Sequence, residues 1–360
     1  MVNHLLVGTR KQPRAPHQSR YACNAQQMTT YCFACTKPRI LTEEHIIPQA
    51  IGGKLKPKLY CKKCNGSFGE VLDCEISKQF GWIGALLNIK RERGELQPYE
   101  LIDRKTGTKL LCDGKSLKRK TPIVKIKSKD GVTLDSADVT ARTEEELKKI
   151  CDSIQKRYQV PGGMKTFQES RPGPTDTEHA MMIDNKLLRR AVSKIAYGFA
   201  CTKLPQKVIF TSEFDNIRNY IKSSNKSDLA SANFLHTGFM TDHVRPIHKI
   251  HISLNRDKEL LIGFVSLFGI FRFTILLAER FKSNLEWAGL DYTYDPVSRK
   301  QVLGNDNFRA PRLSRDNILR PKQSKTLVQN ELNRGYKALN TYTKDIRSLG
   351  GEFCEEKRDA

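Results

Sequence analysis

The chain has 360 residues, enough for two or three folded domains of ordinary size. Its content of 38% hydrophobic and 28% charged residues excludes a wholly disordered chain, and a formal charge of +23 favours a partner rich in phosphate. A basic surface of another purpose, or an anionic lipid, is the alternative to nucleic acid. Ten scattered or paired cysteines exclude the dense disulfide framework of a small secreted domain, so we expect a reducing, cytoplasmic setting.

Residues 1–30 form a basic segment, because no acidic residue precedes Glu43. The segment lacks the long apolar core of a secretory signal. We predict a disordered basic arm. An organellar transit peptide has the same acid-free composition and stays open as an alternative.

Two Cys-x-x-Cys pairs follow, Cys32 with Cys35 and Cys61 with Cys64. Cysteines spaced in this way lie on a tight knuckle, and two such pairs supply the tetrahedral ligands that zinc prefers. A redox role is the alternative for one pair, but two copies favour a metal. Four thiolates leave no open position, so we predict a structural Zn²⁺ that contributes folding energy to a segment with little core of its own.

An acid–histidine pair, Glu44 and His45, lies between the cysteine pairs, and Asn65 follows the last cysteine. Hydrolysis of a phosphodiester needs a base to activate water and a cation to stabilise the charge that develops. His45 can be the base, while Glu44 and Asn65 offer hard oxygen ligands to a divalent ion. Because neighbouring residues on a strand point to opposite faces, Glu44 and His45 need a local bend to converge.

The run Glu44-His45-Ile-Ile-Pro48, the Gly52-Gly53 pair and Cys61-Lys-Lys-Cys64-Asn65 resemble the HNH endonuclease superfamily in its zinc-stapled form. The resemblance covers about residues 30–75. It implies a finger of two strands and a helix that holds one catalytic Mg²⁺ or Mn²⁺. By resemblance, Glu44 is the acidic metal ligand, His45 the general base and Asn65 the last ligand, at the helix start. The segment 54–60 lacks the middle asparagine that holds the loop in the family.

The pattern from Ser67 to Leu87 predicts a helix after the finger. Asp73 and Glu75 lie on it, and we expect them to belong to a solvated helix face rather than to the site.

Residues 98–140 alternate in the way of strands, with turns at residues 104–107 and at 129–131. Thr143-Glu-Glu-Glu146 matches a capping box, which predicts a helix that runs to about Tyr158. Apolar residues that recur every fourth position predict a further helix near 183–201, with Leu187, Ala191, Ile195 and Phe199 facing a core. A short helix should span Ser212 to Ile221.

Residues 247–278 are typical of a β meander, and 291–302 of a hairpin that turns at Asp295-Pro296. The apolar run Leu260–Leu277 has a length close to that of a membrane span, but it contains Arg272, which is costly in a bilayer. We predict two buried strands that meet near Gly269.

Three further groups have weaker functional interpretations. We expect structural or surface roles, rather than a second metal site, for the histidines His236, His243, His248 and His251. We expect a solvated turn, rather than a phosphate-binding site, for the basic run 115–120. We expect core positions, rather than base stacking, for the aromatics Phe264, Phe268, Phe271 and Phe273. Arg189 and Arg190 lie off the apolar stripe of their helix and could contact DNA.

The sequence therefore predicts an α+β protein, a zinc-bound HNH finger followed by a larger mixed α+β C-terminal region. The expected division begins with a basic arm (1–30), an HNH domain (31–97) and a strand-rich segment with a closing helix (98–160). A linker (161–178), a regulatory or DNA-binding domain (179–308) and a basic mobile tail (309–360) follow.

We expect metal-dependent hydrolysis of DNA rather than RNA, no membrane contact, and an analogy to restriction or antiphage-defence effectors. Cleavage of both strands would suggest a homodimer. Two alternatives stay open: a zinc ribbon that binds nucleic acid without cutting it, and a nuclease held silent until the C-terminal region senses a ligand or partner.

Overall fold

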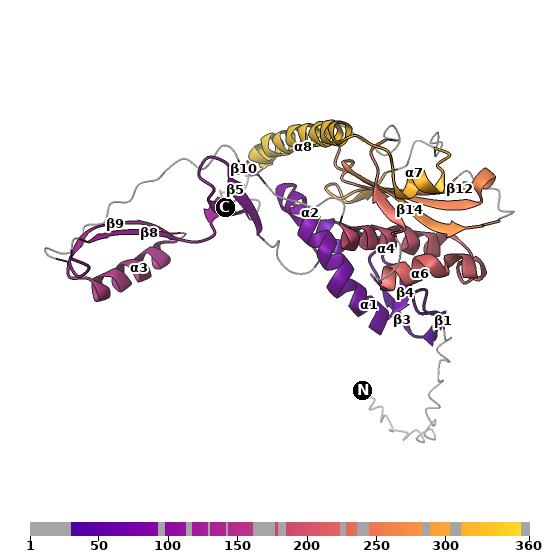
Figure 1. The fold of residues 1–360 in the computed structure, drawn as a ribbon, viewed down its shortest axis with the longest axis horizontal. Coiled ribbons are helices and arrows are strands. Elements are labelled where there is room, and N and C mark those ends of the chain that lie inside the picture. The colour runs from indigo at the N-terminus through magenta and orange to yellow at the C-terminus, as the bar shows by residue number, and fades with distance from the viewer. Residues whose placement is uncertain are drawn as a thin grey trace, which may run out of the picture.

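The computed structural model shows an α+β fold (Figure 1). The predicted arm, apart from Thr30, and nearly all of the predicted linker lie outside the part that it describes. The described residues are 30–92, 98–112, 117–128, 130–141, 143–160, 177–178, 185–223, 228–235, 245–282, 289–302 and 311–353.

The N-terminal finger consists of two short antiparallel pairs and a long helical rod. Strands β1 and β2 flank the first cysteine pair, and strands β3 and β4 lead into the first helix. The predicted two strands plus helix are therefore β3, β4 and α1, and the helix begins at Lys62 rather than Ser67. The elements are β1 (Thr30–Tyr31), β2 (Pro38–Arg39), β3 (Leu41–Glu43), η1 (Gln49–Ile51), β4 (Lys58–Cys61), α1 (Lys62–Phe68), the π-helical η2 (Gly69–Asp73) and α2 (Cys74–Leu86).

The middle of the chain forms two small sheets and a helix. One sheet has the order β10-β5-β6-β7, and the other is the hairpin β8-β9. The predicted helix is present, and the Thr143 hydroxyl accepts a hydrogen bond from the Glu146 N–H at 3.2 Å, as expected of its cap. The elements are β5 (Tyr99–Asp103), β6 (Lys109–Cys112), β7 (Leu117–Arg119), β8 (Ile123–Ser128), β9 (Leu134–Thr140), α3 (Glu144–Arg157) and β10 (Thr177–Glu178).

A six-stranded antiparallel sheet, in the order β11-β14-β13-β12-β15-β16, is the centre of the molecule. The predicted pair of buried strands meets at Gly269, which has φ of 69°, a left-handed conformation that suits glycine. No helix within the described ranges has both the length and the hydrophobicity that crossing a membrane requires. The strands are β11 (Ala230–Ala232), β12 (His248–Asn255), β13 (Leu260–Leu267), β14 (Phe271–Glu279), β15 (Leu290–Asp295) and β16 (Lys300–Gln301).

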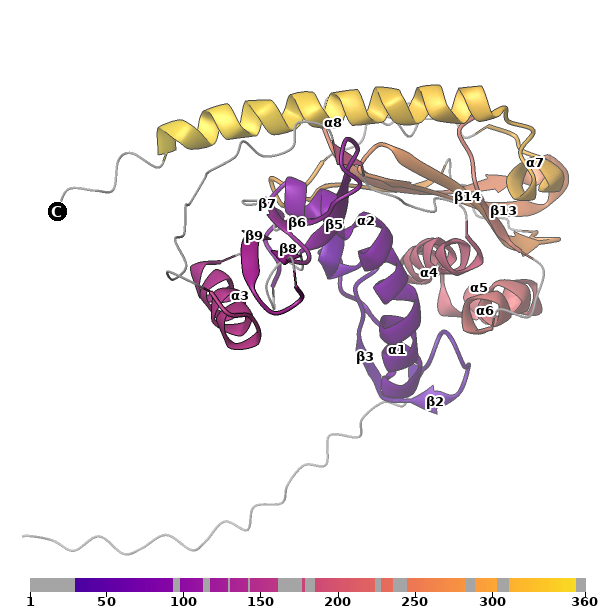
Figure 2. The ribbon, with the colours of Figure 1, turned by 60° about the vertical axis from the view of Figure 1, so that its left-hand side comes forward.

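Helices cover this sheet. The predicted helices near 183–201 and 212–221 correspond to α4 and to η3 with α6. The tail expected from residue 309 contains α7 and α8, and α8 runs along the sheet (Figure 2). The helices are α4 (Lys186–Lys203), α5 (Gln206–Ile209), η3 (Ser212–Phe214), α6 (Asp215–Lys222), η4 (Arg256–Lys258), α7 (Arg315–Leu319) and α8 (Lys325–Phe353).

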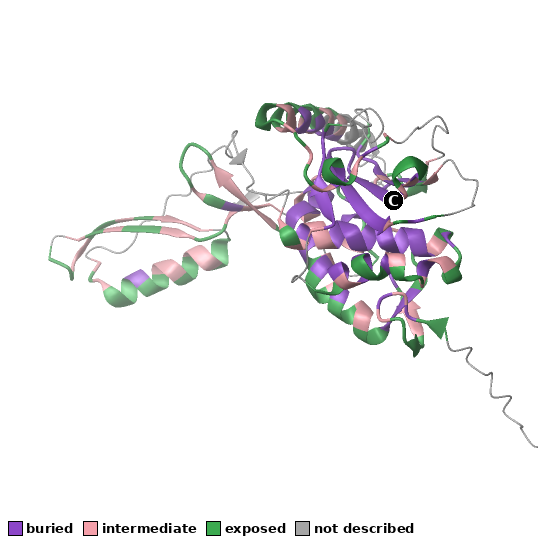
Figure 3. Cartoon of the chain, turned by 45° about the vertical axis from the view of Figure 1, so that its right-hand side comes forward, coloured by how far each residue is buried: buried purple, intermediate pink, exposed green. Residues whose placement is uncertain are grey.

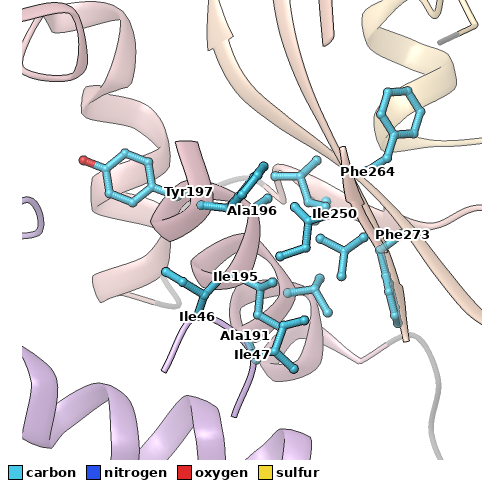
Figure 4. Packing of buried hydrophobic residues seen from close by; sticks show 14 of the residues in the cluster. Ile46, Ile47, Ala191, Ile195, Ala196, Tyr197, Ile250, Phe264 and Phe273 are labelled. Carbon is cyan, nitrogen blue, oxygen red and sulfur yellow. The ribbon is translucent and has the colours of Figure 1, made fainter. Parts of the chain in front are cut away.

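Helix α4 lies between the finger and the sheet and is buried on both sides (Figures 3 and 4). Ala196 approaches the sheet closely, because a Cβ placed on Gly263 would lie 2.8 Å from its Cβ. On the other side, Ile46 of the finger packs where Gly198 leaves room. One cluster of buried apolar side chains therefore runs from the finger through α4 to the sheet.

Helix α8 is attached to the same core. The Arg272 guanidinium of β14 donates to the buried Glu331 carboxylate at 2.9 Å, and the Tyr336 ring lies 6.2 Å from that of Phe271. Trp82 at the end of α2 contacts the same tyrosine, with ring centroids 6.1 Å apart. The C-terminal helix thus joins the finger helix to the sheet.

Candidate metal and catalytic site

The four cysteines of the two predicted pairs gather at one end of the finger. Their sulfur atoms lie within 4.8 Å of one another. Sulfur atoms at zinc–sulfur distances of about 2.3 Å around one tetrahedral ion are roughly 3.8 Å apart, so the donor set fits structural zinc. The Cys61 N–H donates to the Cys32 sulfur at 3.3 Å, a bond typical of thiolate ligands in such knuckles. The geometry supports the predicted four-thiolate frame.

Helix α4 also supports this end of the finger. The Tyr197 hydroxyl donates to the Phe33 carbonyl oxygen, between the first two cysteines, at 2.7 Å. The Phe33 ring stacks on Phe210, with centroids 5.2 Å apart. Residues far along the chain therefore fix the orientation of the knuckle.

The bend predicted beside the acid–histidine pair is present. The register of β3 against β4 shifts between Thr42 and Glu43. Beyond the bend, the Glu44 N–H donates to the Pro57 carbonyl at 3.0 Å and the Ile46 N–H to the Leu55 carbonyl at 3.0 Å. Backbone bonds thus hold this loop, which lacks the family's middle asparagine.

The Glu44 carboxylate points into the protein and is 5% exposed. It forms an ion pair with the ammonium of Lys194, which also donates to the Asp73 carboxylate at 2.6 Å. Burial raises the pKa of Glu44 to about 7; the Lys194 charge opposes this change and Asp73 adds to it. Burial disfavours the charged form of Lys194, but the two carboxylates outweigh it and raise the pKa of this lysine, which stays charged at neutral pH.

His45 lies next to this group and is partly open to solvent. Its Nε2 is 3.8 Å from the Oε2 atom of Glu92. Lys56 holds the same oxygen at 2.7 Å, and Lys54 holds the other carboxylate oxygen at 2.8 Å. Burial lowers the pKa of His45, and the charge of Glu92 partly offsets this effect. A neutral imidazole is the form that can accept a proton.

Asn65 lies in the first turn of α1, as the resemblance implied. Its side-chain NH₂ donates to the Thr42 hydroxyl at 2.9 Å and to the Glu43 carbonyl at 2.8 Å. These two bonds attach the helix to the end of β3 and leave the amide oxygen as the atom that can serve as a ligand.

Glu44, His45 and Asn65 therefore lie at the same end of β3, but each has different partners. The structure brings Glu44 together with Asp73 and Lys194 rather than with Asn65. Carboxylate oxygens are the hard donors that Mg²⁺ and Mn²⁺ prefer, so the chemistry of the Glu44–Asp73 pair fits a divalent ion. The cation that the carboxylates now share is an ammonium group.

Comparison with protein families decides what this finger is. Residues 31–81 match the family model for HNH endonuclease. This segment is an HNH endonuclease domain. The match includes both cysteine pairs and the run from Glu44 to Asn65, and it ends within α2. Neither the search of curated proteins nor that of solved structures found a match.

Two acids after the HNH motif correct the prediction of a solvated helix face. Glu75 is 8% exposed and accepts hydrogen bonds from Gln79 and Asn185, both at 2.8 Å. Asp73 pairs with Lys194. The prediction was wrong because α4 covers this side of the HNH helix.

Lys194 is the residue of this site that the sequence prediction missed. The apolar stripe predicted for this helix did not include it, and α4 is covered on both sides. A signal was present, since Lys194 is the one charged residue between Ala191 and Cys201. A lone charge in such a run indicates a buried partner.

The remaining candidates have structural roles where they are described. His248 is buried, accepts from the Phe268 N–H at 3.2 Å and donates to the Ile51 carbonyl of the HNH domain at 2.8 Å. His251 is also buried and its Nδ1 lies 2.7 Å from an Asp291 oxygen. His236, His243 and residues 115–116 of the basic run lie outside the described residues. The rest of that run is not the predicted turn, because Leu117–Arg119 form β7 against β6 and Lys120 pairs with Glu100. All four phenylalanines are buried, as expected of core.

The two arginines of α4 contact protein rather than presenting a free surface. Arg189 pairs with Asp228 at 2.7 Å. Arg190 donates to the carbonyls of Tyr220 and Ile221 at 3.1 and 2.9 Å. Arg190 therefore attaches α6 to α4, and Arg189 holds Asp228 ahead of β11; DNA binding at these positions stays a hypothesis.

Proposed function

We propose that this protein is a metal-dependent endonuclease that hydrolyses DNA phosphodiester bonds at its HNH domain. The observation that carries the proposal is the end of β3, where an imidazole lies beside a carboxylate and an amide within a segment matched to HNH endonucleases. The formal charge of +23 supports a phosphate-rich substrate.

His45 is the proposed general base. It takes a proton from the attacking water, and the electron pair left on the water oxygen forms the new bond to phosphorus. Glu92, which Lys54 and Lys56 fix in place, lies on the Nε2 side of the ring and helps to orient it. The bond to the 3′-oxygen then breaks, and that oxygen leaves with the bonding electrons.

Glu44 and Asn65 would hold the divalent ion. When bound, Mg²⁺ or Mn²⁺ supplies positive charge that stabilises the phosphate and the departing oxygen. Asn65 is suited to this role because its NH₂ is tied to β3 and its oxygen keeps a fixed direction. The amide is neutral, so the ion keeps enough charge to bind phosphate.

A single HNH finger cuts one strand and has little surface with which to recognise a base sequence. We therefore assign specificity or control to the C-terminal region, and double-strand cleavage to a homodimer or to two successive cuts. A role in restriction or antiphage defence is an analogy by class.

The second candidate function is binding of nucleic acid without cleavage, with the zinc frame as a structural ribbon. The observation that favours it is the ion pair of Glu44 with Lys194, which occupies the carboxylate that a catalytic ion needs.

An assay for nicking of supercoiled plasmid DNA in Mg²⁺ or Mn²⁺ distinguishes the endonuclease from a protein that binds nucleic acid without cutting it. We expect the wild type to convert the plasmid to open circles, and His45→Ala to lose at least a hundredfold of the rate. Glu44→Gln should also be inactive, whereas Glu70→Gln, an exposed acid on the same finger, should cut normally. Cutting by His45→Ala at the wild-type rate would refute the role of the histidine. Binding of DNA with no cutting in either metal would establish the second candidate.

A further inference from the structure

The buried group of Glu44, Asp73 and Lys194 joins two parts of the chain. The two acids belong to the HNH domain, but the lysine comes from α4, outside the segment 31–81 that the family comparison matched. The lysine side chain is 1% exposed, the glutamate side chain 6% and the aspartate side chain 23%. The Glu44–Lys194 pair is therefore shielded from water, and Asp73 lies at its edge, partly open to solvent.

A buried carboxylate that approaches a second, partly exposed carboxylate needs a cation between the two. Lys194 supplies it here, with its Nζ in contact with one oxygen of each acid. A divalent ion would be attracted to the same oxygens and by the same field. The ammonium and the ion therefore compete for one position.

The helix that carries the lysine is held firmly. Ala196 packs on the sheet at Gly263, and Tyr197 bonds to the zinc knuckle. The lysine chain of four methylenes can change rotamer without moving the helix. Loading of an ion requires that the ammonium withdraw from at least one carboxylate, while α4 stays in place.

We propose that Asp73 joins Glu44 as an acidic ligand of the divalent ion, and that Lys194 is a built-in competitor through which the C-terminal region sets ion affinity. This inference rests on the proposed function, since it concerns the same ion. Lys194 is a positioning residue, because it is buried and acts through the two acids.

The test is the affinity of the full-length, zinc-loaded protein for Mn²⁺ without nucleic acid, from the electron paramagnetic resonance signal of free Mn²⁺. Lys194→Met removes the competitor and should bind Mn²⁺ at least tenfold more tightly than the wild type. Lys203→Met changes an exposed lysine at the end of the same helix and should leave the affinity unchanged. Zinc content and circular dichroism show that each variant is folded.

Asp73→Asn gives a second, independent arm that keeps Lys194 in place. It should weaken Mn²⁺ binding at least tenfold if Asp73 is a ligand. Combined with Lys194→Met, it should abolish most of the gain in affinity. A folded Lys194→Met protein with unchanged or weaker Mn²⁺ affinity would overturn the inference, and so would unchanged affinity in Asp73→Asn if Lys194→Met does not fold.

The outcomes separate this inference from the function on which it rests. Mn²⁺ affinities that change as described, in a protein that cuts no DNA, would refute the nuclease proposal alone. Cutting that depends on His45, together with a Mn²⁺ affinity indifferent to Lys194 and Asp73, would refute the competitor alone.

Discussion

The two ends of the HNH domain are assembled in different ways. At the zinc end, all four cysteines come from a short segment, and their sulfur atoms lie within 4.8 Å of one another. At the β3 end, Glu44 depends on Lys194 for its counter-ion, and Ile51 depends on His248 for a hydrogen bond. The zinc end takes all of its ligands from one short segment, with Tyr197 and Phe210 as outside support, whereas the β3 end takes its counter-ion from the C-terminal region. Damage at the two ends should therefore have different consequences.

Loss of one zinc ligand should have the largest effect. We expect Cys61→Ser to remove a large part of a binding free energy of about 10 kcal/mol, typical of structural zinc, and to unfold the finger. Zinc content by plasma mass spectrometry and near-ultraviolet circular dichroism measure the result. Cys74→Ser alters an exposed cysteine outside the cluster and should change neither. Full zinc content in Cys61→Ser would contradict the four-thiolate frame.

Loss of the buried cation should come next. Without added divalent ions, Lys194→Met leaves two carboxylates with no counter-ion and should lower the free energy of unfolding by about 4 kcal/mol. Adding Glu44→Gln removes one of these charges and should restore about 2 kcal/mol in a double-mutant cycle by urea denaturation. Zinc content should stay normal in both variants, which distinguishes this end from the knuckle. Additive effects of the two substitutions would argue against the ion pair.

The joint between the HNH domain and β12 should respond to pH. Burial lowers the pKa of His248 from 6.5 to about 4, with its bond to Ile51 in partial opposition. On acidification, His248 takes up a proton in the unfolded chain before it does so in the folded protein. The contribution of the neutral, buried His248 to the free energy of unfolding is therefore complete above pH 6.5 and is lost as the pH falls toward 4. The shift corresponds to about 3 kcal/mol.

Urea unfolding of the wild type and of His248→Gln between pH 7.5 and pH 4 isolates the contribution of His248 to the free energy of unfolding, because the other groups titrate alike in both proteins. The variant should be less stable at pH 7.5 and should lose stability less steeply on acidification. Parallel curves for the two proteins would show that His248 is not buried as a neutral group.

Substitution of Gly53, in the loop that follows Glu44 and His45, should have the smallest effect on stability. A Cβ on Gly53 would lie 1.7 Å from the Ile47 carbonyl oxygen, so Gly53→Ala must displace the loop and should cost about 2 kcal/mol. Gly66 in α1 has no atom within 4 Å of such a Cβ, and Gly66→Ala should stabilise the helix by about 0.5 kcal/mol. Thermal unfolding compares the melting temperatures of the two variants with that of the wild type. Equal changes in melting temperature would mean that the loop at Gly53 is free to adapt.

The sequence predicted what spacing and residue chemistry determine. The cysteine frame and the bend at Glu44 depend on neighbours within the finger, and the structure contains both. The helical position of Asn65 came from the family resemblance, whereas the sequence pattern placed the helix start at Ser67. The partner of Glu44 was not predicted, because periodicity assigns one buried stripe to a helix, whereas α4 is covered on two sides. The burial of Glu75 was missed for the same reason.

The most direct test of the central claim is chemical rescue of the proposed base. His45→Ala removes the imidazole, and exogenous imidazole at high concentration can replace it as a proton acceptor. Single-turnover cleavage of a labelled DNA duplex should be at least a hundredfold slower in the variant and should rise with imidazole concentration. Cleavage by His45→Ala as fast as by the wild type, without imidazole, would contradict a catalytic site at the end of β3.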